Sequence, residues 1–209
     1  LDDLAMAWRF GAGLPRFLGD TVDAETGAQR IEAAVRERGQ SFLRLLDAAV
    51  FRNPRSPYLP LFANARLQLP DVAALVNGHG VEAALAALYA EGVRITLDEF
   101  KAHSPIRRGG VEIAARPESF DNPVLSGHFV ASTGGSTGAR RRLIIDLDLL
   151  TADTAPRALF LKDAGLRGAP FALWRPAPPG AAGIKRALDH LKAGERVAHV
   201  EEGDGAEQH

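Results

Sequence analysis

The first half of the chain carries its apolar residues at the spacing of amphipathic helices. In the range 26–50 they recur every three or four residues: Ile31, Val35, Phe42, Leu45, Leu46, Ala49 and Val50. This period predicts one long helix, or two helices broken near Gly39. Thr26 and Gln29 have the spacing of an N-terminal capping box, which predicts where the helix begins.

Residues 51–102 are predicted to form a small helical cluster. The segment 51–62 contains three prolines, each of which lacks a backbone donor, so it is expected to be an ordered linker rather than a helix. A short helix is predicted to start at Pro70-Asp71, and an apolar stripe over 81–88 predicts a second one that ends before Gly92. Thr96 and Glu99 repeat the capping-box spacing and predict a third.

The period changes after residue 105. Alternating apolar and polar positions predict strands at 110–117, 127–133, 141–146, 169–176 and 195–202. Helical spacing predicts helices at 148–164 and 183–193. The expected fold class is therefore α/β: a helical N-terminal region, residues 1–105, leads into a mixed α/β layer, residues 106–209, with partly parallel strands. We expect one incomplete domain rather than two independent ones.

Composition limits the classes of function. The chain has 209 residues, 46% of them apolar, and a formal net charge of −1, so it has no overall field to attract nucleic acid or an anionic membrane. No apolar run approaches the roughly 20 residues that span a bilayer. The absence of cysteine excludes disulfides, a thiol nucleophile and thiolate metal sites within these residues. We therefore expect a cytoplasmic protein that binds neither nucleic acid nor membrane.

One turn concentrates small polar residues and positive charge, in the sequence "FVASTGGSTGARRRLIID" at 129–146. Its three glycines, Gly134, Gly135 and Gly138, permit a concave row of backbone N–H donors that favours anions. Hydroxyl donors and a run of three arginines flank them: Ser132, Thr133, Ser136, Thr137, Arg140, Arg141 and Arg142. The pattern predicts a site for a polyphosphate or another oxyanion; the alternative is a β-hairpin with a charged, solubilising edge.

Two common phosphate loops do not fit this turn. No lysine follows the glycines and no helix is predicted after the turn, which excludes a Walker loop. The glycine spacing also differs from that of a dinucleotide-binding fold.

Other candidate residues have competing interpretations. His79, His103 and His128 lack a regular metal-ligand spacing, so no metal site is predicted. His128 lies on the strand before the turn and either lines a substrate cleft or faces solvent. Trp174, with Phe171, belongs to the core or lines an acyl pocket. Asp146 and Asp148 are expected to cap the next helix rather than bind Mg²⁺.

The turn resembles the Ser/Thr/Gly-rich phosphate loop of the adenylate-forming superfamily, whose usual form is T-S-G-T-T-G-x-P-K between two antiparallel strands. Carried over position by position, Thr133 stands at the first Thr, Gly135 and Gly138 at the two glycines, and Arg141 at the Lys. Gly134 replaces the Ser, Ser136 and Thr137 match the hydroxyl pair, and Arg140 departs from the usual Pro.

One branch of that superfamily resembles more of the chain. The stretches "NPRSPYLPLF" and "ALYAEGVRITLDEFKAHSPIRRGG", followed by "STGGSTG", are similar to the N-terminal portion of phenylacetate–CoA ligases and of the acyl-protein synthetases of bacterial luminescence. The stretch "GLRGAPFALWRPAPPGAAGIKRAL" resembles the strand and helix that follow the loop in the superfamily. The similarity is specific at the loop and moderate over 54–138.

The resemblance implies a ligase that activates a small carboxylic acid with ATP and Mg²⁺, followed by transfer to a thiol acceptor, either CoA or a carrier protein. The phosphate-binding residues would be Ser132, Thr133, Gly134, Gly135, Ser136, Thr137, Gly138 and Arg141, and His128 and Trp174 would border the substrate cleft. The superfamily's Y-G-x-T-E, T-G-D and R-x-x-x-x-K segments and its C-terminal lysine do not follow the loop in these 209 residues. No catalytic residue is therefore identified here. We expect the remaining domain to lie in cis or on a partner chain; the alternative is a noncatalytic or partner-dependent binding module.

Overall fold

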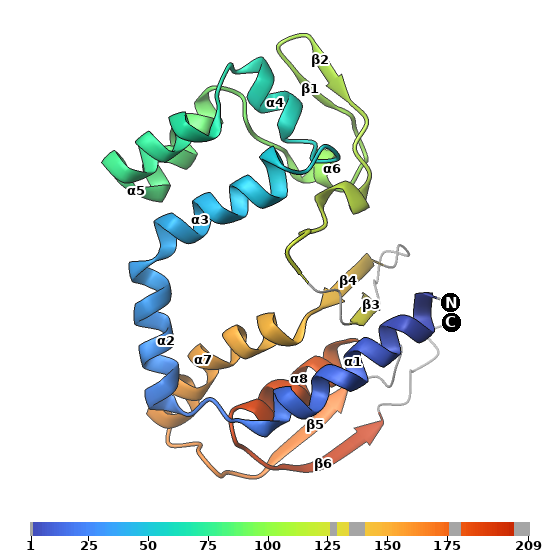
Figure 1. The fold of residues 1–209 in the computed structure, drawn as a ribbon. Coiled ribbons are helices and arrows are strands. Elements are labelled where there is room, and N and C mark those ends of the chain that lie inside the picture. Colours follow the sequence, from blue (N-terminus) through green and yellow to red (C-terminus); the bar gives the residue numbers. More distant parts are fainter. Residues whose placement is uncertain (1, 126–128, 134–140, 176–180, 203–209) are drawn as a thin grey trace. The chain divides into compact units, whose positions relative to one another are not determined.

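The computed structural model describes residues 2–125, 129–133, 141–175 and 181–202 (Figure 1). The chain divides into two compact units, residues 1–33 with 125–209, and residues 34–124. It is mostly helical, with 63% helix, and its described strands form two-stranded sheets, so the fold is mixed rather than a broad α/β layer. This grouping differs from the predicted boundary near residue 105, because residues 106–124 join the helices before them and residues 1–33 join the C-terminal part.

The first unit combines helices with two strand pairs. Its described elements are α1 (Asp2–Gly19), most of α2 (Ala24–Arg36), β3 (Phe129–Thr133), β4 (Arg141–Ile145), α7 (Leu147–Asp163), β5 (Phe171–Arg175), α8 (Ala181–Lys192) and β6 (Val197–Glu202). Its core contains Phe17 of α1, Ile145 of β4, Leu147 and Leu150 of α7, and Leu188 of α8. Helix α1 therefore contributes to the same core as elements more than 100 residues later in the chain.

The strands of this unit pair in two different ways. Strands β3 and β4 are antiparallel, whereas β5 and β6 are parallel and are connected through α8. Parallel strands need a crossover of this kind, and a helix usually supplies it. Helix α8 also packs against β3 and β4. The prediction of partly parallel pairing is confirmed, but no backbone pairing joins the two strand pairs in the described residues.

The second unit is a helical cluster with one hairpin. It contains α3 (Arg38–Leu46), a π-helical turn (Asp47–Phe51), α4 (Leu59–Asn64), α5 (Leu69–Ala90), α6 (Leu97–Phe100), β1 (Ile106–Arg108), β2 (Val111–Ile113) and a 3₁₀ turn (Pro117–Phe120). Helices α3 and α5 lie side by side (Figure 1). The buried centre consists of Val50, Leu61, Phe62, Val72, Val76, Ala84, Leu88, Val93 and Ile106.

Several helix boundaries predicted from local sequence patterns agree with the structure. The break predicted near Gly39 occurs between α2 and α3, at Glu37. The capping box at Thr96 and Glu99 is confirmed: Thr96 N donates to Glu99 Oε2 at 2.7 Å, and Glu99 N donates to Thr96 Oγ1 at 3.3 Å. The apolar stripe before Gly92 is the second half of α5, which is kinked at Gly80, where φ is 84°.

Three local predictions were wrong. Helix α2 starts at Ala24 and not at Thr26, because the Asp23 carboxylate accepts from Thr26 N at 2.8 Å and caps the helix one turn earlier. Helix α4 begins inside the predicted linker, with Pro60 in its first turn, where a proline leaves no helical hydrogen bond unmade. The β5–β6 pair also stands apart from the other strands instead of extending one layer.

Helix α5 is long and apolar enough to cross a membrane by length and composition alone, with a mean hydropathy of 1.2. The non-helical residue Gly80 interrupts it, and Val72, Val76, Ala84 and Leu88 from its two halves are buried in the second unit. In its most apolar stretch 22% of the helix is buried, so α5 contributes one face to the core of this unit.

Candidate functional site

The predicted phosphate turn is carried by the antiparallel pair β3–β4. The pairing runs from Phe129 opposite Ile145 to Thr133 opposite Arg141. In the sequence, residues 134–140 connect Thr133 to Arg141. The pair is anchored to the first unit at its far end, where Ile145 is 3% exposed in the core and leads directly into α7.

The described residues include only part of the predicted phosphate-binding set. Ser132 and Thr133 end β3, and Arg141 begins β4, so these three positions lie at the same end of the strand pair. Gly134, Gly135, Ser136, Thr137 and Gly138, together with Arg140 and His128, lie outside the described residues. Their predicted roles therefore stay predictions.

Trp174 belongs to the other strand pair. It lies on β5, where its parallel partner is Glu201 of β6. Backbone hydrogen bonds do not connect this pair to β3–β4 within the part of the chain that the structure describes, although α8 packs against both. Strand pairing thus does not bring Trp174 to the phosphate turn. Phe171, its companion in the sequence, stacks on the His190 ring with centroids 3.7 Å apart.

Asp146 caps helix α7, as predicted. Its Oδ1 accepts from Asp148 N at 2.9 Å and from Leu149 N at 3.0 Å, and the residue is 2% exposed. A carboxylate in this position also complements the positive end of the helix dipole. Within the described ranges, no three His, Asp or Glu side chains lie close enough together to hold a metal ion.

A buried polar network joins α7 to α8, and the sequence patterns did not indicate it. Asp189 accepts from Thr154 Oγ1 at 2.9 Å and lies 3.4 Å from Arg157 Nε. A guanidinium nitrogen of Arg157 lies 2.5 Å from His190 Nδ1. Because a guanidinium can only donate, His190 Nδ1 is the acceptor of this hydrogen bond, which requires a neutral imidazole. Burial, followed by the charge of Arg157, lowers the pKa of His190. These contacts join residues more than 30 positions apart, so no local sequence pattern marks them.

A largely buried ion pair joins two elements of the other unit. Arg108 of β1 donates to both carboxylate oxygens of Glu99 on α6, each at 2.8 Å. Glu99 is 6% exposed, and the hydrogen bonds from Arg108 lower its pKa to about 2. A bidentate pair of this kind fixes both geometry and charge. We interpret it as a structural contact, since it ties strand β1 to helix α6.

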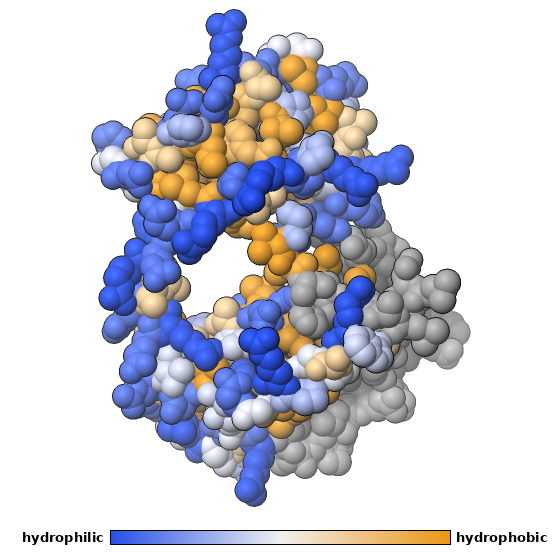
Figure 2. Space-filling view, in the orientation of Figure 1, coloured by the Kyte–Doolittle hydropathy of each residue, from blue (hydrophilic) through white to orange (hydrophobic). Residues whose placement is uncertain are grey.

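The second unit also contains an apolar pocket of about 590 Å³. Helices α3 and α5 form its apolar walls in part, through Phe42, Leu45, Leu46, Leu85, Leu88 and Tyr89, and the remaining lining comes from the segments 49–62, 93–95 and 119–122. Figure 2 shows hydrophobic side chains gathered along the face where these two helices lie side by side. The polar lining residues are Ser56, Tyr58, Arg94, Ser119, Asp121 and Asn122. The sequence analysis did not single out this pocket, because its walls come from segments spread over 80 residues.

The comparisons with known proteins add no relative to this picture. The chain matches no protein-family model, no curated protein and no solved structure. The functional argument therefore depends on the residues of the chain and on the geometry described above.

Proposed function

We propose that this chain is the N-terminal region of an ATP-dependent ligase that adenylates a small carboxylic acid. The observation that carries the proposal is the sequence GGSTGAR at 134–140, held between Thr133 and Arg141 at the end of an antiparallel strand pair. The phosphate loop of adenylate-forming enzymes occupies the same place between two antiparallel strands. The acid substrate, the thiol acceptor and the rest of the active site belong to this proposal and not to the described structure.

The turn would act by presenting hydrogen-bond donors to phosphate oxygens. When a carboxylate attacks the α-phosphorus of ATP, negative charge grows on the departing pyrophosphate. Fixed N–H and O–H donors stabilise that charge without reorganising, each contributing about 3 kcal/mol to the transition state. Gly135 and Gly138 would supply backbone donors, Ser136 and Thr137 hydroxyls, and Arg141 a cation at the edge of the turn.

Mg²⁺ would supply further charge neutralisation on the phosphates. The described residues offer no acidic cluster for it, and Mg²⁺ is commonly held largely by substrate phosphates and water. The proposal therefore assigns the ion to the nucleotide and assigns the described side chains no direct contact with it.

The segment after the turn, β5–α8–β6, also supports the proposed function. The β5–α8–β6 unit gives a parallel crossover, the connection on which α/β domains are built. Helix α8 lies against both the β3–β4 pair and β5, so it links the turn's support to this crossover. A complete nucleotide-binding domain would extend such a unit with further strands.

Calorimetric titration with pyrophosphate and with ATP·Mg²⁺ tests the proposal. We expect the 209-residue chain to bind both, Arg141→Ala to weaken binding about 10-fold through loss of a charge-assisted hydrogen bond, and Gly135→Val to abolish it. Arg36→Ala, which removes an exposed arginine of α2, is the matched control and should change nothing. Absence of heat with both ligands, or equal effects of the Arg36 and Arg141 variants, would contradict the proposal.

The second candidate is a noncatalytic or partner-dependent binding module. It shares the phosphate-loop sequence with the first candidate and differs from it only in lacking chemistry. Pyrophosphate exchange separates this candidate from a self-sufficient enzyme. We expect the 209 residues to catalyse no exchange with a panel of aryl and acyl acids, whereas a single measured turnover would show that the chain is sufficient for catalysis.

A further inference from the structure

The pocket of the second unit has the size of a ligand site. Its volume of about 590 Å³ lies in the usual range of small-molecule pockets, roughly 300 to 1,000 Å³. Every lining residue falls between Phe42 and Asn122, within the second unit. Leu45, Leu85 and Tyr89 on its rim are 44%, 48% and 61% exposed, so an apolar ligand would cover side chains that now face solvent.

The polar side of the pocket is rich in hydrogen-bond donors. Ser56 is 4% exposed, and in the described part of the chain neither its hydroxyl nor that of Tyr58 has a side-chain hydrogen bond. Burial raises the pKa of Tyr58, which keeps the phenol protonated and able to donate. Asn122 Oδ1 already accepts from Val124 N at 3.0 Å, which leaves the amide N–H₂ group to donate.

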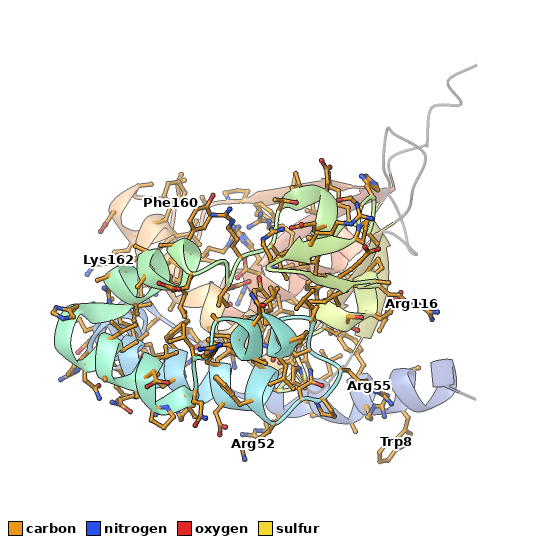
Figure 3. The ribbon with its side chains drawn as sticks, turned by 90° about the horizontal axis from the view of Figure 1, so that it is seen from above. Trp8, Arg52, Arg55, Arg116, Phe160 and Lys162 are labelled. Atoms are coloured by element: carbon orange, nitrogen blue, oxygen red, sulfur yellow. The ribbon has the colours of Figure 1, made fainter. Side chains whose placement is uncertain are left out.

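Arg94 adds a positive charge at this side. Its guanidinium lies over the Tyr89 ring, 4.5 Å from the centroid, and donates to Tyr89 O at 3.3 Å. These contacts hold the cation next to the apolar wall and leave further N–H donors for a ligand. Arg52 and Arg116 are exposed and point away from this unit in Figure 3, and neither lines the pocket. Among the lining residues that the structure describes, Asp121 is the only acidic one.

We propose that this pocket binds a single amphiphilic small molecule, with its apolar body between α3 and α5 and an anionic, hydrogen-bond-accepting head group near Arg94 and Tyr58. An acceptor head group matches the donors that line the polar side, and an apolar body matches the leucines and aromatic rings opposite. This proposal does not rest on the proposed function, because it is argued from Ser56, Tyr58 and Arg94 of the second unit and not from the phosphate turn.

Four ten-carbon probes with different head groups test the proposal on the intact 209-residue chain, each used below its micellar concentration. They are decanoate, decyl sulfate, decanol and decyltrimethylammonium. Calorimetry should rank both anions at least 10-fold tighter than the ammonium probe. Methyl NMR should show shifts for Leu45, Leu46, Leu85 and Leu88, and none for Leu147 or Leu150 in the core of the other unit.

Paired variants separate the contribution of the head group from that of the apolar body. Arg94→Gln should weaken the binding of the two anionic probes about 10-fold and the binding of decanol less than twofold. Arg36→Gln should change neither affinity. Leu85→Ser should weaken the binding of the anionic probes and of decanol by the same factor. Leu97→Ser, at a residue 63% exposed on α6 outside the pocket, should weaken neither and so controls for a general loss of exposed apolar surface.

Three results would overturn the proposal. If the ammonium probe binds as tightly as decanoate, the assignment of an anionic head group is wrong. If none of the probes binds or shifts the pocket methyls while both variants remain folded, the pocket is not a ligand site. If the chain dimerises in analytical ultracentrifugation and Leu85→Ser makes it monomeric, a second copy of the chain occupies this face instead.

Discussion

Arg108 and Glu99 form a buried, bidentate ion pair that joins strand β1 to helix α6, with both N···O distances at 2.8 Å. Arg108 also donates to Arg94 O at 3.3 Å, next to the apolar pocket. The pair thus connects the hairpin, the short helix and one wall of the proposed ligand site, all within the second unit.

Breaking this pair should destabilise the chain markedly. Glu99→Gln leaves the largely buried Arg108, whose side chain is 17% exposed, without its counter-charge, and we expect a loss of about 2 kcal/mol in the free energy of unfolding. Glu112→Gln is the matched control, because its pair with Arg107 is exposed on both sides, is screened by water and should contribute much less. Urea denaturation followed by circular dichroism measures both values, and equal losses would show that the buried pair has no special role.

The buried His190 should make stability depend on pH. Its folded-state pKa is lowered below 6.5 by burial and by Arg157, and the nearby Asp189 and Glu195 oppose this shift only in part. The contribution of neutral His190 to the free energy of unfolding is therefore complete above pH 6.5. It is lost as the pH falls from 6.5 through the folded-state pKa, because the unfolded chain binds the proton first. The slope for one proton is at most about 1.4 kcal/mol per pH unit.

Unfolding measured between pH 8 and pH 5.5 checks this expectation. His190→Gln should be less stable at pH 8 but should show a flatter dependence on pH. His79→Gln, at an exposed histidine of α5, is the control and should keep the wild-type slope. If the slope survives in His190→Gln, another group is responsible.

Gly27 should not tolerate a methyl group. A Cβ at this position of α2 would lie 2.8 Å from the carbonyl oxygen of Ala155 on α7. Backbone cannot yield as a flexible side chain does, so Gly27→Ala should cost about 1 to 3 kcal/mol. Gly11→Ala in α1 meets nothing within 4 Å and should stabilise the helix by up to about 1 kcal/mol. Thermal unfolding of the two variants should shift in opposite directions.

Lys192 should be essential for holding α1 in place. Its side chain is 2% exposed, and Nζ donates to Phe17 O at 2.7 Å, Asp20 O at 3.0 Å and Asp20 Oδ1 at 2.6 Å. Lys192→Met removes these donors and should destabilise the first unit by about 2 kcal/mol. Hydrogen exchange should show the α1 amides opening first. Lys185→Met, which breaks the half-exposed pair with Asp153, should leave α1 protected.

Local signals in the sequence were enough to predict many elements. Alternation of apolar and polar residues predicted the strands that became β2 to β6, and short-range capping chemistry predicted Asp146 and the Thr96–Glu99 box. These features depend on residues only a few positions apart, so the local sequence is enough to predict them.

Features that depend on distant contacts could not be predicted in this way. Helix α1 contains Pro15 and three glycines, which disfavour a helix, yet Phe17 is buried and Lys192 donates to the backbone carbonyl of Phe17. The contacts of Arg157 with His190 and of Arg108 with Glu99 join different elements, and neither pair has a local sequence signature. The same holds for the apolar pocket and for the grouping of residues 1–33 with 125–209.

The most direct test of the central claim is a map of where pyrophosphate binds. Amide NMR of the ¹⁵N-labelled 209-residue chain, titrated with pyrophosphate, should show its largest and saturable shifts at residues 132–141. No saturable shift, or shifts centred on the arginines of the β1–β2 hairpin, would contradict the assignment of this turn as a phosphate-binding site.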